Sequence, residues 1–234
     1  MGGLMLPSIM LALCFLLEAG AAQRSGFRVC AFNLHHFGES KSRKSDVMQT
    51  LARIISRCDV CLLQEVRDSK GTALPKLLEQ IRLSDPAHAY KSVASARLGR
   101  TESYQEQYVF VYRSDTATLA DTYQYPDDLP GDEDAFAREP SDPAHAYKSV
   151  ASARLGRTES YQEQYVFVYR SDTATLADTL FWLLPEDSDS TVRASTSCSY
   201  DRIVVHGETF NRAVVPFSAR AFNFQAEYRL TEEQ

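Results

Sequence analysis

The segment Asp59-Val60-Cys61-Leu62-Leu63-Gln64-Glu65-Val66-Arg67-Asp68 decides the fold class of this chain. Its first half, Asp59 to Leu63, is a short apolar run of the kind that forms a buried strand. The run ends in Gln64 and Glu65, so polar side chains follow at the point where the strand leaves the core. We therefore predict a central buried strand with a carboxylate at its end.

Around this strand the pattern alternates between strands and helices. Residues 27–32 are expected to form a short strand that ends at Asn33. Ser45 or Asp46 can cap a helix whose apolar residues share one face at 3.6-residue spacing, namely Val47, Met48, Leu51, Ile54 and Ile55. A second helix is predicted around residues 74–83. The order strand, helix, strand, helix favours a layered α/β fold.

The tail of the chain carries two weaker patterns. Tyr200 to His206 is typical of a strand, with Asp201 at its entrance. The last residues, Leu230 to Gln234, are expected to begin a helix.

Composition is that of an ordinary globular protein. The chain has 234 residues, of which 44% are hydrophobic and 24% charged, and this excludes a disordered or collagen-like protein. Its length suffices for one sizeable α/β domain or two small ones. The formal net charge of −6 argues against binding nucleic acid through charge alone. A nucleic-acid partner would require metal ions or a few placed arginines.

The N-terminus resembles a secretory leader. The apolar run Leu4 to Leu17 is too short to span a bilayer comfortably, and the small residues 19–22 behind Glu18 form a cleavage-site pattern. We predict a signal peptide over residues 1–22, a domain over 23–234, and a location that is extracellular or in the endomembrane lumen. A buried N-terminal helix is the alternative.

The cysteines that follow the leader are Cys30, Cys58, Cys61 and Cys198. The spacing of Cys58 and Cys61 is also found in redox and zinc motifs. However, Cys61 enters the apolar run and no second pair of ligands follows. A buried strand cysteine is the favoured interpretation of Cys61.

Residues 84–122 recur without change at 141–179. Repeat proteins need several units, so two copies indicate a recent duplication or a faulty gene model rather than a solenoid. Each copy contains one predicted strand, residues 107–113 or 164–170, and both strands suit the same place in one core. We predict that the first copy occupies it, because it continues into Tyr123 as a native segment would.

Three residues point to a metal-dependent phosphodiester site. Glu65 and Asn33 end neighbouring predicted strands and offer oxygen ligands of the kind that Mg²⁺ takes. In α/β sheets, ligands bind at such strand ends. Arg67 is two residues beyond Glu65, so on an extended chain it projects to the same side and could meet a phosphate or a base edge.

A set of motifs resembles the deoxyribonuclease I family, a branch of the endonuclease/exonuclease/phosphatase superfamily. The resemblance covers roughly residues 27–140 and 181–234, and the motifs follow in the family's order. They are Ala31-Phe32-Asn33, Gln64-Glu65-Val66-Arg67-Asp68, Leu98-Gly99-Arg100, Ser103-Tyr104-Gln105-Glu106-Gln107-Tyr108, Phe136-Ala137-Arg138-Glu139-Pro140 and Tyr200-Asp201-Arg202-Ile203-Val204. The resemblance implies a two-sheet α/β sandwich flanked by helices, incomplete here, and a monomeric endonuclease that hydrolyses double-stranded DNA with Mg²⁺ and Ca²⁺.

The resemblance also implies roles for individual residues. Catalysis would involve Glu65, Glu106 and Asp201, with Glu65 as a Mg²⁺ ligand beside Asn33 and Glu106 orienting a catalytic histidine. Arg67 and Tyr104 would enter the minor groove of DNA, and Arg138 would contact a phosphate. A Ca²⁺ site is implied at Asp134, Glu139 and the carbonyl of Phe136, with Asp127 or Asp128 as a further ligand. Without the resemblance, this acidic loop is equally typical of a solvated charge run.

Parts of the family's machinery are absent from the sequence. The family uses two histidines as general acid and base. Pro140 runs directly into the second copy, where the first histidine would follow. The G-D-F-N motif, beside which Cys198 would find its usual disulfide partner, is absent, and so is the S-D-H motif of the second histidine. The histidines present lack the motif context and are expected to be exposed loop residues: His35, His36, His88, His145 and His206.

The missing groups predict that this chain is inactive as a nuclease. The alternatives are a non-catalytic relative that binds DNA or a protein, and a mis-assembled gene model without a function of its own.

Overall fold

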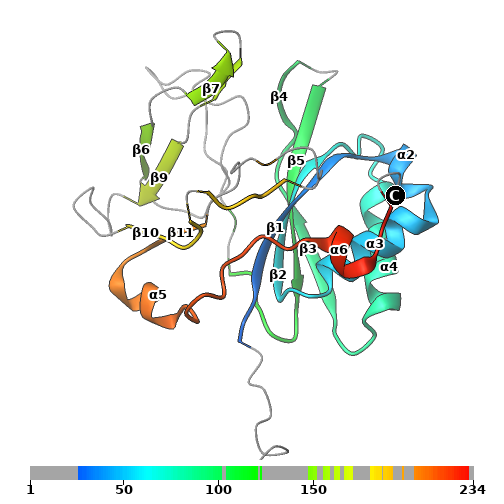
Figure 1. Ribbon diagram of the computed structural model, residues 1–234. Coiled ribbons are helices and arrows are strands. Elements are labelled where there is room, and N and C mark those ends of the chain that lie inside the picture. Colours follow the sequence, from blue (N-terminus) through cyan, green and yellow to red (C-terminus); the bar gives the residue numbers. More distant parts are fainter. Residues whose placement is uncertain are drawn as a thin grey trace, which may run out of the picture.

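The computed structural model describes residues 26–101, 104–120, 122, 147–151, 155–158, 161–163, 166–170, 180–185, 187–191, 197 and 203–231 (Figure 1). Strands and helices alternate along its N-terminal half, which confirms the α/β class.

The largest sheet lies in the N-terminal half. Its main path runs β1 (Val29–Phe37), β2 (Val60–Val66), β5 (Tyr104–Arg113) and β3 (Tyr90–Ala94), and β4 (Leu98–Thr101) also pairs with β5. β1 and β2 are parallel, while β5 pairs antiparallel with β2, β3 and β4. The parallel pair sets the carboxyl ends of β1 and β2 side by side.

Three helices cover one face of this sheet (Figure 1). They are α2 (Glu39–Ser42), α3 (Ser45–Ile55) and α4 (Ala73–Ser84), so both predicted long helices are confirmed. Between sheet and helices lies one apolar core, which includes Cys61, Leu63, Val109 and Val111 from the strands and Leu51, Ile55, Leu77 and Ile81 from the helices. β2 alternates, however: Leu62 on the opposite face is half-buried, so this strand is less enclosed than its apolar run predicted.

Several element boundaries differ from the sequence prediction, and the two ends of the chain show this best. β1 continues past Asn33 to Phe37, because Leu34 and Phe37 both bury their side chains in the core. At the other end of the chain, Leu230 and Thr231 are not helical as predicted, and residues 232–234 lie outside the described residues. α6 (Phe224–Tyr228) lies before Leu230, and Arg229 ends that helix with a left-handed φ of 54°.

The first copy of the repeated segment belongs to the main sheet, since it supplies β3, β4 and β5. The strands of the second copy are β6 (Tyr147–Ala151), β7 (Leu155–Thr158), β8 (Tyr161–Glu163) and β9 (Val166–Arg170), and they pair as β6–β9 and β7–β8. Both copies keep the same register, with Tyr90 opposite Arg113 and Tyr147 opposite Arg170. The prediction that the first copy packs into the domain is confirmed.

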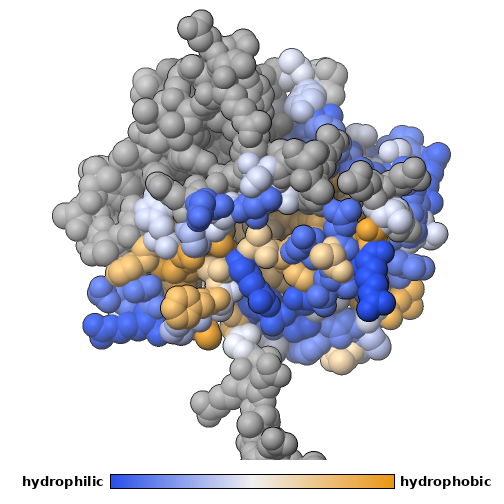
Figure 2. Space-filling view, in the orientation of Figure 1, coloured by the Kyte–Doolittle hydropathy of each residue, from blue (hydrophilic) through white to orange (hydrophobic). Residues whose placement is uncertain are grey.

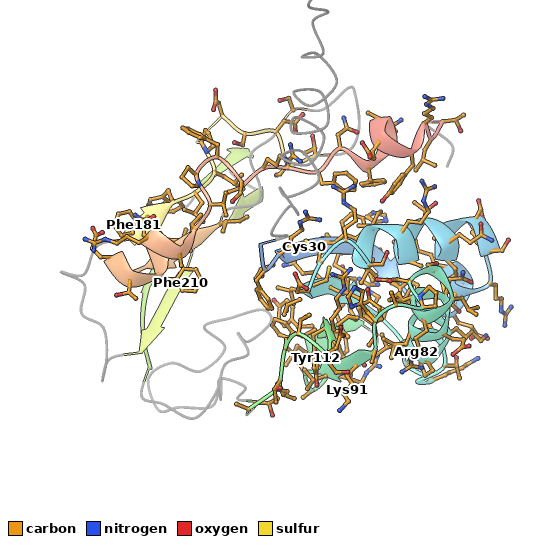
Figure 3. All side chains as sticks on the ribbon, turned by 90° about the horizontal axis from the view of Figure 1, so that it is seen from below. Cys30, Arg82, Lys91, Tyr112, Phe181 and Phe210 are labelled. Atoms are coloured by element: carbon orange, nitrogen blue, oxygen red, sulfur yellow. A yellow bond between two sulfur atoms is a disulfide. The ribbon has the colours of Figure 1, made fainter. Side chains whose placement is uncertain are left out.

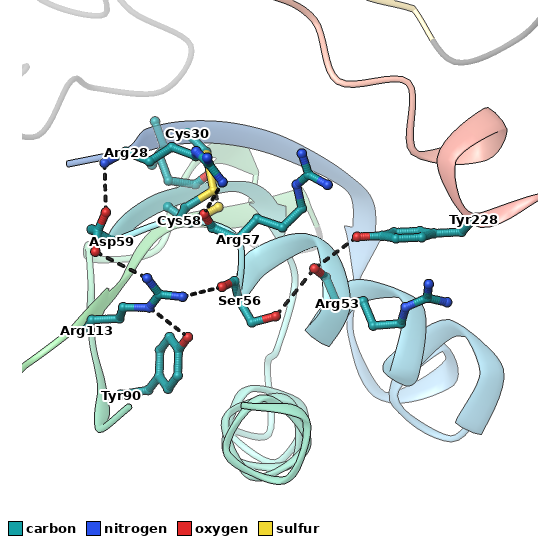
Figure 4. Close-up of a disulfide and its surroundings, with 12 residues drawn as sticks. Arg28, Cys30, Arg53, Ser56, Arg57, Cys58, Asp59, Tyr90, Arg113 and Tyr228 are labelled. Carbon is teal, nitrogen blue, oxygen red and sulfur yellow. Dashed lines mark hydrogen bonds and ion pairs between the residues drawn. A yellow bond between two sulfur atoms is a disulfide. The ribbon is translucent and has the colours of Figure 1, made fainter. Parts of the chain in front are cut away.

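A disulfide joins Cys30 of β1 to Cys58, just before β2 (Figure 4). Cys61 is a free cysteine, and its burial raises the pKa of its thiol to about 12, so the buried interpretation of Cys61 is confirmed. The pairing of Cys30 with Cys58 was not predicted. Cys198 lies outside the described residues.

An ion-pair network fastens β5 to the start of β2 beside the disulfide (Figure 4). Arg113 contacts the Asp59 carboxylate at 3.3 Å, and it donates to the carbonyl of Ser56 at 2.6 Å and to the hydroxyl of Tyr90 at 3.1 Å. Asp59 also accepts from the backbone N–H of Arg28 at 2.7 Å. The network therefore ties the first copy of the repeat to both central strands.

The C-terminal part adds a two-stranded sheet and two short helices. β10 (Leu180–Trp182) pairs with β11 (Val204–His206), and α5 (Glu208–Ala213) follows. Phe181 and Phe210 lie on this side of the molecule (Figure 3), and Figure 2 shows apolar atoms over β10–β11 and α5. The exposed apolar side chains there include Trp182, Phe210, Val215 and Phe217.

α6 rests on the main domain. The ring of Phe224 packs edge-on against Phe32 with centroids 5.4 Å apart, and Tyr228 donates to the carbonyl of Arg53 at 3.0 Å. Among the described residues, no helix is both long and apolar enough to cross a membrane.

Candidate active site

Glu65 lies at a break in the regular pairing of β2. Its φ of 57° is left-handed, and the register with β5 shifts between Leu63 and Val66. A non-glycine residue in this conformation is strained and persists because its surroundings fix it. The common side predicted for Glu65 and Arg67 is observed, since both contact the same cluster. The break appears before Arg67, because Leu63 and Val66 are three positions apart and both are buried in the core.

Three groups around Glu65 hold its carboxylate. The Asn33 amide nitrogen donates to Oε1 at 2.8 Å, the backbone N–H of His36 donates to Oε2 at 3.2 Å, and the His36 ring nitrogen Nδ1 lies 2.9 Å from Oε2. Burial alone would raise the pKa of Glu65, but the Asn33 hydrogen bond and the charges of His36 and His35 outweigh it and lower that pKa. Glu65 is therefore an anion at neutral pH.

Asn33 positions Glu65 in this arrangement. Its side-chain oxygen accepts the backbone N–H of His35 at 2.7 Å, which directs the amide nitrogen toward Glu65. The predicted role of Asn33 as a metal ligand stays a prediction.

Glu106, Arg67 and Tyr104 form the second half of the site. Arg67 Nε donates to Glu106 Oε1 at 2.8 Å, and the Arg67 guanidinium lies 3.7 Å from the centre of the Tyr104 ring. Glu106 is 2% exposed, and Arg67 and Tyr104 are 25% and 45% exposed. The arrangement thus presents a cation stacked on an aromatic ring at the surface, held from below by a buried carboxylate.

His36 was predicted to be an exposed loop residue, and this was wrong in part. Its side chain is 41% exposed, but its Nδ1 lies 2.9 Å from Glu65 and 3.4 Å from Glu106, which joins the two halves of the site. His35 and His36 have left-handed φ values of 46° and 62°. The adjacent His-His sequence was visible, but nothing in the sequence placed one ring between the two carboxylates.

Two motif residues serve the scaffold. The carboxylate of Asp68 accepts the backbone N–H groups of Thr72, Ala73 and Leu74 at 2.8–2.9 Å, so it caps the start of α4. Gly99 has a φ of 145°, and a side chain there would collide with the carbonyl of Tyr104. The L-G-R motif therefore keeps β4 close to the strand that carries Glu106.

A small open pocket of about 100 Å³ adjoins these groups, lined by Asn33, Gln64, Glu65, Leu98, Glu106, Gln107 and Tyr108. The donor set fits a divalent cation, because the ring nitrogen of His36 and carboxylate oxygens of Glu65 and Glu106 lie within 4.8 Å of one another. Carboxylate oxygens are the ligands that Mg²⁺ takes.

The remaining predicted site residues lie outside the described residues. These are Asp201 for catalysis, Arg138 for DNA contact, and Asp127, Asp128, Asp134, Phe136 and Glu139 for Ca²⁺. Their roles stay predictions.

Comparison with known proteins identifies the class. Residues 30–172 match the Endonuclease/Exonuclease/phosphatase family. The chain is 36% identical to deoxyribonuclease-1 of Equus caballus, over 100% of this chain and 94% of the relative. It is 35% identical to human deoxyribonuclease-1-like 1, over 95% of this chain and 84% of the relative, and 33% identical to human deoxyribonuclease gamma, over 88% and 81%. Within this class, the chain belongs to the deoxyribonuclease I family of nucleases.

Proposed function

We propose that this chain binds duplex DNA at the edge formed by the carboxyl ends of β1 and β2, with Mg²⁺ held there through Glu65. The observation that carries the proposal is the continuous cluster Glu65, His36, Glu106, Arg67 and Tyr104, in which acidic and DNA-contacting groups adjoin. The relatives named deoxyribonucleases supply the reaction class, hydrolysis of DNA phosphodiester bonds.

Electrostatics require the metal. The carboxylates of Glu65 and Glu106 would repel a phosphate, and the chain carries a formal charge of −6. A bound divalent cation neutralises phosphate charge and acts as a Lewis acid toward the phosphoryl oxygen. Arg67, stacked on Tyr104, presents a planar cation and a ring at the surface, a pair suited to a phosphate and a sugar in a DNA groove.

The proposed rate of hydrolysis is low. The resemblance places the first general acid or base of the family just after Pro140, where this sequence enters its second copy of residues 84–122. Loss of one such group typically reduces the rate ~10²–10⁴-fold. We therefore expect almost no cleavage by the chain as it stands.

A non-catalytic DNA-binding relative is the second candidate. One observation favours it: among the described residues, Arg67 contacts both Glu106 and Tyr104, which belong to the first copy. The proposed DNA contact thus needs none of the missing catalytic segments.

The finer parts of the proposal concern Ca²⁺, the remaining DNA contacts and location. We propose that Asp134, Glu139 and the Phe136 carbonyl hold Ca²⁺. We also propose that Asp201 and Arg138 complete the site, and that the protein acts as a monomer. The Cys30–Cys58 disulfide supports a secreted protein, because disulfides persist in oxidising compartments.

Plasmid nicking tests this function. The purified full chain and its Glu65→Ala variant would be incubated with supercoiled plasmid, Mg²⁺ and Ca²⁺, and both would be assayed for duplex binding by fluorescence anisotropy. We expect duplex binding that needs Mg²⁺ and Glu65, with nicking no faster than by the variant. Nicking that Glu65→Ala abolishes would refute the low rate and establish a nuclease. A folded chain without Mg²⁺-dependent binding would refute the proposed function.

A further inference from the structure

We propose that His36, Glu65 and Glu106 bind a transition-metal ion of the Zn²⁺ class, with the imidazole nitrogen of His36 as one ligand. The inference shares Glu65 with the proposed function and names a second metal class for that site. It concerns this chain's own His36, which the motifs of the sequence did not select.

The distances fit such an ion with little movement. His36 Nδ1 lies 2.9 Å from Glu65 Oε2 and 3.4 Å from Glu106 Oε1. Bonds of about 2.1 Å from Zn²⁺ to nitrogen and oxygen place neighbouring ligands of a tetrahedron about 3.4 Å apart. Two of the three ligand separations are therefore close to those of a tetrahedral site, and the two carboxylate oxygens lie within 4.8 Å of each other.

The chemistry of the donors favours a transition metal over Mg²⁺. Imidazole nitrogen suits Zn²⁺ and its neighbours in the first transition row, whereas Mg²⁺ takes oxygen ligands. Three protein ligands with an open fourth position are typical of zinc sites that retain a bound water. The exposed side of His36 and the adjoining pocket leave room for that fourth ligand.

The local backbone holds the imidazole in this position. Lys41 donates from Nζ to the carbonyls of Leu34 and His35 at 3.0 and 2.6 Å, and Asn33 accepts the N–H of His35 at 2.7 Å. These bonds fix the left-handed turn that directs His36 toward Glu65. Preorganised ligands lose little conformational freedom when a metal binds.

Arg67 limits the affinity. Its Nε donates to Glu106 Oε1 at 2.8 Å, so an entering ion must share that oxygen with Arg67 or displace it. The site is thus expected to bind zinc reversibly.

The test compares two adjacent histidines. The metal-free full chain would be titrated with Zn²⁺ by calorimetry and with Co²⁺ by visible absorption, without DNA. His36→Ala removes the proposed ligand, whereas His35→Ala removes an imidazole 4.8 Å from the His36 ring that is not in the cluster. Loss of an outer-shell partner alone costs ~10–100-fold in metal affinity. We therefore expect His36→Ala to reduce the affinity for Zn²⁺ at least tenfold, and His35→Ala to change that affinity by less than about twofold.

Mg²⁺ titration and spectroscopy of the unaltered chain complete the experiment. Mg²⁺ affinity is expected to fall less than Zn²⁺ affinity in the His36→Ala chain, because Mg²⁺ prefers oxygen ligands. Zn²⁺ is expected to shift the ring resonances of His36 but not those of the distant His88 in the NMR spectrum of the unaltered chain. No Zn²⁺ binding, equal losses in both histidine variants, or an equal loss of Mg²⁺ affinity would overturn the proposal. Because DNA is absent, failure here leaves the nicking and DNA-binding results unaffected.

Discussion

At the scale of single residues, each position of Gln64-Glu65-Val66-Arg67-Asp68 has its own task. Gln64 lines the pocket, and Val66 is 1% exposed in the core. Glu65 and Arg67 belong to the site, and Asp68 caps α4. From Glu65 to Asp68 the side chains alternate as those of a strand do. The left-handed φ of Glu65 interrupts the alternation before that point, so that Leu63 and Val66, three positions apart, are both buried in the core.

Asp68→Ala tests the capping role. The substitution leaves three backbone N–H groups at the start of α4 without their acceptor. We expect the free energy of unfolding to fall by ~1–3 kcal/mol. Urea denaturation followed by circular dichroism measures it. The exposed Asp187 is the matched control, and Asp187→Ala is expected to change stability by less than ~0.5 kcal/mol. Equal effects of the two substitutions would refute the cap.

The lowered pKa of Asp59 predicts how the free energy of unfolding depends on pH. Burial opposes its ionisation, but hydrogen bonds from Arg28, Thr116 and Arg113 outweigh burial and lower its pKa below the usual 3.8. A lowered folded-state pKa contributes stability that is present above the unfolded-state value and is lost as pH falls through the folded-state value. Asp59→Asn is therefore expected to destabilise the protein at neutral pH and to flatten the fall in stability below pH ~4. Denaturation midpoints at several pH values would show the same acid dependence in both chains if this account were wrong.

At the scale of elements, the long helices and the central strands were predictable, because their apolar spacing is strong. α3 and α4 were placed to within a residue or two, and the buried strand β2 was recognised. The irregular end of β1, from Leu34 to Phe37, was not predicted. The local sequence does not show that the side chains of Leu34 and Phe37 are buried in the core, and their burial extends β1. The Cys30–Cys58 disulfide was missed for the same reason, since pairing depends on tertiary contacts.

Two leucines of α4 test how this helix stabilises the fold. Leu77 is fully buried against the sheet, whereas Leu83 on the same helix is 67% exposed. Leu77→Ala is expected to cost ~2–5 kcal/mol through lost contacts and a cavity, while Leu83→Ala costs less than ~0.5 kcal/mol. Thermal unfolding of the two variants compares them directly. Similar losses would mean that α4 does not pack as described.

At the scale of the whole molecule, the identical copies raise the question of which one builds the domain. The sequence alone predicts that the two copies compete for one place in the core, because both carry the same hydrophobic pattern. The structure assigns the place beside β2 to the first copy, whose Asp59–Arg113 ion pair links it to the start of that strand. The site follows from this assignment, since Glu106 and Tyr104 are first-copy residues. The acidic loop at 127–139 and Asp201 remain predictions from the resemblance.

Val109 and Val166 are the same position in the two copies. Val109 is fully buried in the core between β2 and the helices. Val109→Asp is expected to cost more than ~4 kcal/mol, because it buries an unpaired charge, whereas Val166→Asp leaves the main core intact. The amount of folded, secreted protein and its denaturation midpoint distinguish them. A larger loss in the Val166→Asp chain would show that the second copy occupies the sheet.

The most direct test again compares one position in the two copies, this time a position that lies in the site in the first copy. Glu106→Gln and Glu163→Gln are the same substitution in the two copies, and Glu106 alone is proposed to hold Arg67 beside the metal. Mg²⁺-dependent binding of duplex DNA would be measured by fluorescence anisotropy for both variants and the unaltered chain. We predict that Glu106→Gln weakens binding at least ~10-fold and that Glu163→Gln binds as the unaltered chain does. Unchanged binding by Glu106→Gln, or equal losses in both variants, would contradict a DNA-binding site built by the first copy.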